Sequence, residues 1–174
     1  MSDASTKYYG KYRATVFNNT DPEQRGRLQA IVPDVLGQVP SSWAMPCLPV
    51  AGKGSGSYLL PEVGAGIWIE FEQGDSNYPI WAGCFWGAFA ELPEQGMRSV
   101  PSVPNIVFQT NGRNSLTIYG DPVQGITICA GPVDVPTSPR LTITPTEITI
   151  TNSQATIRLA GTTVDINNGA LTIM

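Results

Sequence analysis

Residues 141–173, LTITPTEITITNSQATIRLAGTTVDINNGALTI, repeat one short pattern five times: an aliphatic residue, a polar or charged residue, and a second aliphatic residue. The five triplets start 7, 9, 7 and 7 residues apart, and turn-forming residues such as Thr-Pro, Asn-Ser and Asn-Asn-Gly separate them. Because successive side chains of a strand point to opposite faces, the two aliphatics of each triplet share one face. The repeat therefore predicts an array of short strands with a single apolar face.

This apolar face predicts that the chain assembles with copies of itself. Two aliphatics per short strand, with no helix to cover them, cannot form a closed core within one chain, and the strand edges would stay open. Three chains wound around a common axis would pair the edges and turn the aliphatics inward, where each contributes about 1.5–3 kcal/mol by leaving water. The alternative is a parallel β-helix formed by a single chain. The predicted core of the trimeric needle consists of Leu141, Ile143, Ile148, Ile150, Ile157, Leu159, Val164, Ile166, Leu171 and Ile173.

The first half of the chain has a different composition. All four tryptophans precede residue 91, whereas threonine, isoleucine and asparagine dominate after residue 105. Residues 67–72, IWIEFE, alternate so that Ile67, Ile69 and Phe71 share one face of a strand. About five short strands closed by glycines favour a small Greek-key barrel of the OB-fold type.

The domain boundaries follow from these changes of composition. Three prolines within residues 91–104 and no periodicity indicate an extended connector. The predicted organisation is an N-terminal arm at 1–9, an OB-fold domain at 10–90, a Pro-rich linker at 91–104 and the needle at 105–174. The fold class is all-β: an OB-fold barrel followed by an intertwined trimeric triple-stranded β-helix.

The composition excludes several classes of function. The 174 residues contain no histidine, so neither a Ser-His-Asp or Cys-His catalytic unit nor an imidazole metal site can form. The formal net charge of −4 argues against a nucleic-acid partner, because phosphate contacts require a basic surface. No catalytic residue, cofactor or metal ligand is predicted. The three cysteines Cys47, Cys84 and Cys129 lack a CxxC pair and are predicted to be buried free thiols.

The first half also resembles a known family. The match extends over residues 8–87, in order and with compatible spacing, and it is more specific than any single motif. The matching segments are YYGKYRATV at 8–16, DPEQRGRLQ at 21–29, VPDV at 32–35, SWA at 42–44, LPEVG at 60–64, IWIEFEQGD at 67–75 and PIWAG at 79–83. They resemble the OB-fold domain of contractile-tail spike proteins, the phage baseplate spike (gpV-like) and VgrG families. Residues 105–112, NIVFQTNG, resemble the first segment of the needle in that family.

The resemblance implies a homotrimeric central spike without enzymatic activity, which pierces a target envelope when the sheath contracts. It implies a baseplate hub protein as a separate chain, a PAAR-type tip protein as a cap, and transient contact with the envelope. The cap would meet Leu171, Ile173 and Met174. The implied location is a virion tail baseplate or an assembled injection particle, after synthesis in the bacterial cytoplasm, since residues 1–6 lack the apolar stretch of a signal peptide. Some family members hold iron with histidines at the tip, which this sequence cannot do.

Two interpretations remain open at the level of sequence. Arg25 and Arg27 lie beside the Asp21-Pro22 turn, where they either form a solvated strand end or contact a neighbouring subunit or the hub. The alternative function for the whole chain is a monomeric OB-fold module with a β-solenoid tail, which would bind nucleic acid or saccharide.

Overall fold

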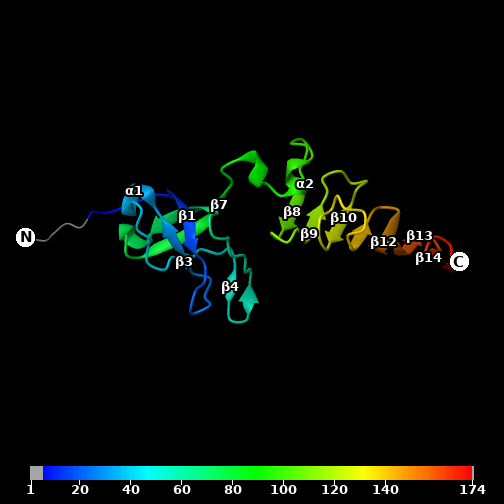
Figure 1. Ribbon diagram of the computed structural model, residues 1–174, viewed down its shortest axis with the longest axis horizontal. Helices are drawn as coiled ribbons and strands as arrows, with labels where there is room; N and C mark the ends of the chain where they lie inside the picture. The colour runs from blue at the N-terminus through cyan, green and yellow to red at the C-terminus, as the bar shows by residue number, and fades with distance from the viewer. Residues whose placement is uncertain (1–5, 174) are drawn as a thin grey trace, which may run out of the picture. The chain divides into compact units, whose positions relative to one another are not determined.

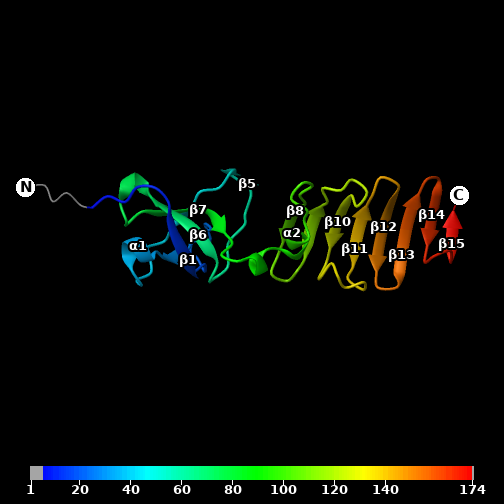
Figure 2. The same ribbon diagram turned by 90° about the horizontal axis from the view of Figure 1, so that it is seen from above.

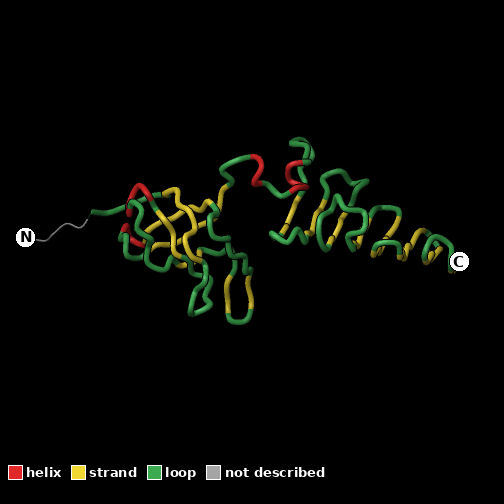
Figure 3. Tube along the Cα trace, in the orientation of Figure 1, coloured by secondary structure: helices red, strands yellow, loops and turns green. Residues whose placement is uncertain are grey.

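A computed structural model describes residues 6–173 as two compact units, which divide between Ala88 and Phe89. Met174, which was predicted to contact a cap, lies outside the described residues. Figure 3 shows that strands and loops dominate both units. The all-β fold class is therefore confirmed. No helix among residues 6–173 is long and apolar enough to cross a membrane.

The first unit contains a five-stranded sheet (Figure 1). Its strands pair in the order β2-β1-β6-β7-β3, antiparallel except for the parallel β3–β7 pair. The strands are β1 (Tyr12–Asn18), β2 (Gln29–Ile31), β3 (Met45–Pro46), β6 (Gly66–Phe71) and β7 (Pro79–Phe85). Leu28 and Ala44, which adjoin β2 and β3, exchange two backbone hydrogen bonds of 3.2 and 2.7 Å. This pair links the two ends of the sheet and closes it into a small barrel of the OB type.

The barrel core follows the alternation seen in the sequence. Ile67, Ile69 and Phe71 are buried, as predicted, whereas Trp68 on the other face packs against Phe85. The complete buried apolar cluster consists of Ala14, Val16, Leu28, Ala30, Val32, Ala44, Ile67, Ile69, Phe71 and Trp81. The indole N–H of Trp81 donates a hydrogen bond of 3.0 Å to the Gly26 carbonyl, so this aromatic residue belongs to the core.

Short elements complete the two units. The first unit adds α1 (Pro33–Leu36), the hairpin of β4 (Ala51–Gly52) and β5 (Ser55–Gly56), and the 3-10 turn η1 (Glu72–Gly74). The second unit begins with η2 (Phe89–Glu91) and α2 (Glu94–Met97).

The second unit contains an eight-stranded sheet in which every strand pairs with the next one along the chain (Figure 2). All of these pairs are antiparallel, which makes the single-chain parallel β-helix wrong for the described residues. The strands are β8 (Ile106–Gln109), β9 (Ser115–Ile118), β10 (Ile126–Cys129), β11 (Arg140–Ile143), β12 (Glu147–Asn152), β13 (Ala155–Ala160), β14 (Thr163–Ile166) and β15 (Leu171–Ile173).

This topology changes the physical basis of the predicted trimer. The sequence analysis assigned the pairing of strand edges to neighbouring chains that wind around each other. In the structure the chain pairs its own strands, and only β8 and β15 are at the edges of the sheet. Gly125 (φ +68°) shows how tightly neighbouring strands are connected, because a Cβ at this position would overlap the Ile143 carbonyl oxygen.

Residues 91–104 are not the extended connector that the prolines predicted. They fold against the start of the second sheet as a covering segment, which includes α2. Asn105 joins the two: its Nδ2 donates to the Gln95 carbonyl (3.0 Å), and its Oδ1 accepts from Gly120 N–H (3.1 Å). Glu94 pairs with Arg98 at 2.5 Å and with Arg113 at 2.8 Å. The lack of periodicity therefore reflects irregular but hydrogen-bonded structure.

The cysteine prediction is correct for pairing and wrong for burial at two of three positions. All three thiols are free, and Cys129 is buried beneath the loop that follows β10. Cys47, which follows β3, and Cys84, in β7 opposite Ile67 of β6, are exposed in the isolated chain.

A buried ion pair holds the turn between β1 and β2. The Asp21 carboxylate accepts hydrogen bonds from the backbone N–H groups of Glu23, Arg25 and Arg27, and the Arg27 guanidinium binds its Oδ1 at 2.7 Å. The Asp21 side chain is only 3% exposed. The Arg27 guanidinium and these N–H groups hold the pKa of Asp21 well below its ordinary value, although desolvation opposes the shift.

We expect Asp21→Asn to lower the midpoint of thermal unfolding of the barrel, because the charged acceptor of this hydrogen-bond network is lost. A carboxylate with a depressed pKa in the folded state stabilises the protein above its unfolded pKa and loses this effect as the pH falls. The difference between wild type and Asp21→Asn should therefore be largest near neutral pH and shrink below about pH 4.

Tryptophan fluorescence measures this effect on the barrel alone, since all four tryptophans lie in the first unit. Glu23→Gln is the matched control, because Glu23 also pairs with Arg27 but its side chain is 55% exposed. Equal unfolding midpoints for Asp21→Asn and Glu23→Gln at pH 7 would show that the buried pair does not hold the turn.

Candidate functional site

The most distinctive feature of the second unit is a continuous apolar face. The register of the eight strands aligns their apolar residues in two parallel rows, with one residue of each row on every strand. We call them the apolar rows. The first row is Ile106, Ile118, Ile126, Ile143, Ile148, Leu159, Val164 and Ile173, and the second is Phe108, Leu116, Ile128, Leu141, Ile150, Ile157, Ile166 and Leu171.

No member of the apolar rows is buried in the isolated chain. The exposed fractions of Ile150, Leu171 and Ile173 are 48%, 52% and 56%. Water-exposed aliphatics on this scale mark an interaction surface, because soluble monomers rarely expose contiguous apolar patches of this extent. The chemistry available to such a face is burial against another apolar surface.

The opposite face of the sheet is polar. Between the two apolar rows, the central residues of β9 to β12 are Thr117, Thr127, Thr142 and Thr149, and those of β13 and β14 are Arg158 and Asp165. The Arg158 guanidinium binds Glu147 Oε2 at 2.5 Å across neighbouring strands. Cross-strand threonine and charge pairs stabilise such a sheet surface. Thr117 and Thr127 are buried within the second unit, whereas Thr142 and Thr149 are half-buried and Arg158 is exposed. The two faces therefore have different roles.

The predicted needle residues all lie in the apolar rows. The structure places the ten aliphatics from Leu141 to Ile173 on one face of β11 to β15, whether or not a trimer covers them. It adds six residues of β8 to β10 that the sequence analysis left out of the core: Ile106, Phe108, Leu116, Ile118, Ile126 and Ile128. The triplets of β9 and β10 have the same pattern, but loops of unequal length after Ile118 and Cys129 hide the regular spacing. In β8 the central residue is the apolar Val107, so the pattern is absent there.

The two arginines that were candidates for a contact differ in their surroundings. Arg27 is largely buried, binds Asp21, and lies over the Trp43 ring at 5.6 Å. Arg25 pairs with Glu23, and its side chain is 53% exposed. Arg27 thus has a place in the barrel, and Arg25 has a guanidinium that faces solvent. A contact of either residue with another protein stays a prediction.

Residues 6–173 contain no cluster of three or more Cys, Asp or Glu side chains suited to a metal ion. Two glutamates lie close together in sequence at the end of β6 but are not part of such a cluster. Glu70 binds Lys11 Nζ at 2.6 Å, and Glu72 begins the 3-10 turn η1 that follows β6. The most extensive candidate site in the described chain is therefore the apolar face.

Comparison with known proteins agrees with the two units. Residues 12–86 match the family described as the type VI secretion system/phage-baseplate injector OB domain. Residues 105–172 match the phage baseplate V C-terminal trimerisation domain, and this range contains nearly all of the apolar rows. No curated protein matches the chain. An OB barrel of the injector type, followed by a strand array of the trimerisation type, shows that the chain belongs to the gpV-like family of baseplate spike proteins.

Proposed function

We propose that the protein is the trimeric, non-enzymatic central spike of a contractile injection machine. The observation that carries this proposal is the pair of apolar rows, which none of residues 6–173 buries and which coincides with a trimerisation domain. The family supports a homotrimer and a structural role in the baseplate of a virion tail or injection particle.

In the proposed trimer, three eight-stranded sheets face a common axis with their apolar rows. The axis then contains only Ile, Leu, Val and Phe side chains, and Thr142 and Thr149 lie on the face of the sheet away from the axis. Each aliphatic side chain that leaves water contributes about 1.5–3 kcal/mol, and the contributions recur along all eight strands. Such a needle is stiff, because bending it would separate close-packed layers.

Stiffness is what the proposed action requires. On sheath contraction the needle would transmit an axial load from the hub to the target envelope. The OB barrel would be the adaptor beneath the hub. A PAAR-type protein would cap the other end, at Leu171, Ile173 and Met174, where β15 is the last strand of the sheet. A cap that pairs with β15 would also protect an unpaired strand edge.

The trimer predicts opposite effects for neighbouring substitutions on β12. Ile150→Asp would place three carboxylates close together on an apolar axis, where they can neither be hydrated nor paired, so the trimer should not form. Thr149→Asp is the matched control: it lies on the polar face, directly opposite Arg158, and should leave the trimer intact.

Light scattering gives the molar mass of each variant, and tryptophan fluorescence shows whether the barrel has folded. We expect a trimer for wild type and Thr149→Asp, and loss of the trimer for Ile150→Asp with a folded barrel. A stable trimer of Ile150→Asp would contradict the packing of the apolar rows. A monomeric wild type would favour a binding module in place of a spike.

Contact of Arg25 with the hub predicts different effects for substitutions of Arg25 and Arg27: one on capture by the hub, the other on barrel stability. Arg25→Ala should weaken capture of the protein by the co-expressed hub and leave barrel stability unchanged, because Arg25 faces solvent. Arg27→Ala should lower barrel stability, because it leaves the buried Asp21 carboxylate without its cation. Capture in a pull-down and unfolding by tryptophan fluorescence report the two effects. Unchanged capture of Arg25→Ala would remove Arg25 from the hub interface.

A further inference from the structure

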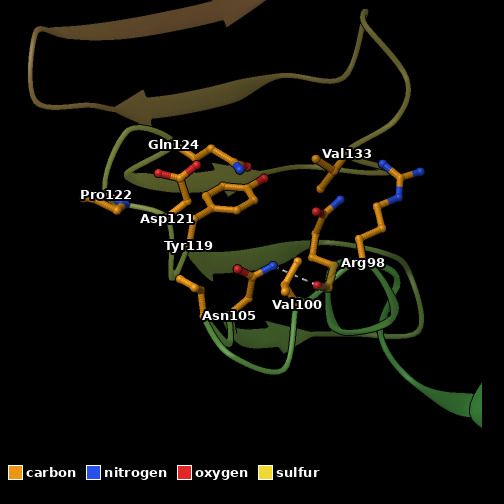
Figure 4. Close-up of a pocket in the computed structure, with 10 residues that line it drawn as sticks. Arg98, Val100, Asn105, Tyr119, Asp121, Pro122, Gln124 and Val133 are labelled. Atoms are coloured by element: carbon orange, nitrogen blue, oxygen red, sulfur yellow. Dashed lines mark hydrogen bonds between the residues drawn. The ribbon is translucent and has the colours of Figure 1, made fainter.

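A cavity of about 650 Å³ lies in the second unit, on the side away from the apolar rows. Residues of the covering segment, of the turn after β9 and of the loop after β10 line it. In Figure 4 the Tyr119 ring lies in the middle, with Asp121 and Gln124 on one side and Arg98 and Val133 on the other. This volume is within the range of about 300–1,000 Å³ typical of ligand sites.

The cavity contains a buried polar side chain without a protein partner. Gln95 lines the cavity and is only 4% exposed, yet no described residue hydrogen-bonds to its side-chain amide. The backbone carbonyl of Gln95 accepts from Asn105 Nδ2, and Asn105 Oδ1 accepts from Gly120 N–H, which joins the covering segment to the turn after β9. A buried carboxamide offers two donors and an acceptor, and leaving them unpaired is costly. This amide is therefore available to a ligand.

The charges around the cavity disfavour an anionic ligand. Arg98 is already paired with Glu94 at 2.5 Å, a carboxylate that it shares with Arg113, so it is not an unpaired cation. Asp121 adds a carboxylate, of which Oδ1 accepts from Val123 N–H at 2.9 Å and Oδ2 faces no described partner. A phosphate or carboxylate would meet repulsion from Asp121 without an unpaired cation in compensation.

The backbone around the cavity disfavours a peptide that would bind by strand addition. Tyr119 N–H donates to the Gly125 carbonyl at 2.9 Å, and Val103 N–H donates to the Val100 carbonyl at 2.8 Å. These backbone groups and Gly120 N–H are already paired, so a ligand would be recognised by side chains. The side chains that line the cavity offer one aromatic ring, two glutamine carboxamides and one carboxylate oxygen. A sugar ring matches this set, because its hydroxyls donate to a carboxylate and exchange hydrogen bonds with amides, while its C–H face packs on an aromatic ring.

We propose that this cavity binds a neutral saccharide unit, with Tyr119 as the stacking platform and Gln95, Asp121 and Gln124 as the hydrogen-bonding groups. None of its lining residues belongs to the apolar rows, so packing of the rows in the proposed trimer does not use these residues. Only the number of sites per particle rests on the proposed trimer. A trimer then carries three identical sites around the base of the needle. Weak single sites in this arrangement can combine on a glycan-rich surface.

The test uses the full chain and two soluble probes, maltotetraose for hexoses and chitotetraose for N-acetylhexosamines. Saturation-transfer NMR detects binding, and titration gives the dissociation constant. We expect one of the two probes to bind, and Tyr119→Ala to weaken it about tenfold or more through loss of the platform. Asp121→Asn should weaken it as well. Tyr58→Ala is the matched control, since this tyrosine is exposed in the other unit and should leave binding unchanged.

The outcomes separate this inference from the proposed function, because light scattering of the same samples reports the trimer independently. Absence of binding by both probes overturns the saccharide site, as does equal binding by wild type, Tyr119→Ala and Asp121→Asn. If either result is obtained with an intact trimer, the spike proposal stands. A monomer that binds sugar through Tyr119 would retain the site and overturn the spike. Binding of tetra-alanine in competition with the sugar would assign the cavity to peptides instead.

Discussion

The exposure of sixteen apolar side chains to water on one face of the second sheet is the constraint on which the rest of the structure depends. Each strand of this sheet forms backbone hydrogen bonds with the next strand of the same chain, but no described segment of the chain lies over the apolar rows. The unsatisfied requirement is thus hydrophobic and not one of hydrogen bonding. Packing of one sheet against another would bury the apolar rows, and the three chains of a homotrimer supply identical surfaces for this packing.

The barrel is built on the opposite principle. Its ten-residue core is closed within one chain, and the β1–β2 turn is fixed by a carboxylate with three N–H donors and a guanidinium. A unit that folds alone suits an adaptor, because it can present a fixed surface before assembly. The covering segment belongs to the second unit, in which Thr117 and Thr127 at the start of the sheet are buried.

The sequence predicted the elements whose side chains obey a simple period. The alternation of Ile67, Ile69 and Phe71 identified a half-buried strand, and the aliphatic triplets identified every strand from β11 to β15. It could not predict which strands pair, because a triplet pattern is the same for winding chains and for a meander. Nor could it predict the fold of residues 91–104, where isolated contacts such as Gln95–Asn105 replace periodicity. The cavity around Tyr119 was missed for the same reason, since its lining comes from three irregular segments.

The antiparallel meander has a consequence for the length of the proposed needle. Each strand adds about 4.8 Å along the sheet, and each hairpin returns the chain to the side from which it started. Insertion or deletion of one hairpin would therefore lengthen or shorten the needle by about 10 Å without changing its cross-section or the position of its last residue relative to the sheet edges. A single inserted strand would instead move the terminus to the other side. The length of the proposed needle would therefore change in steps of one hairpin, and not of one triplet.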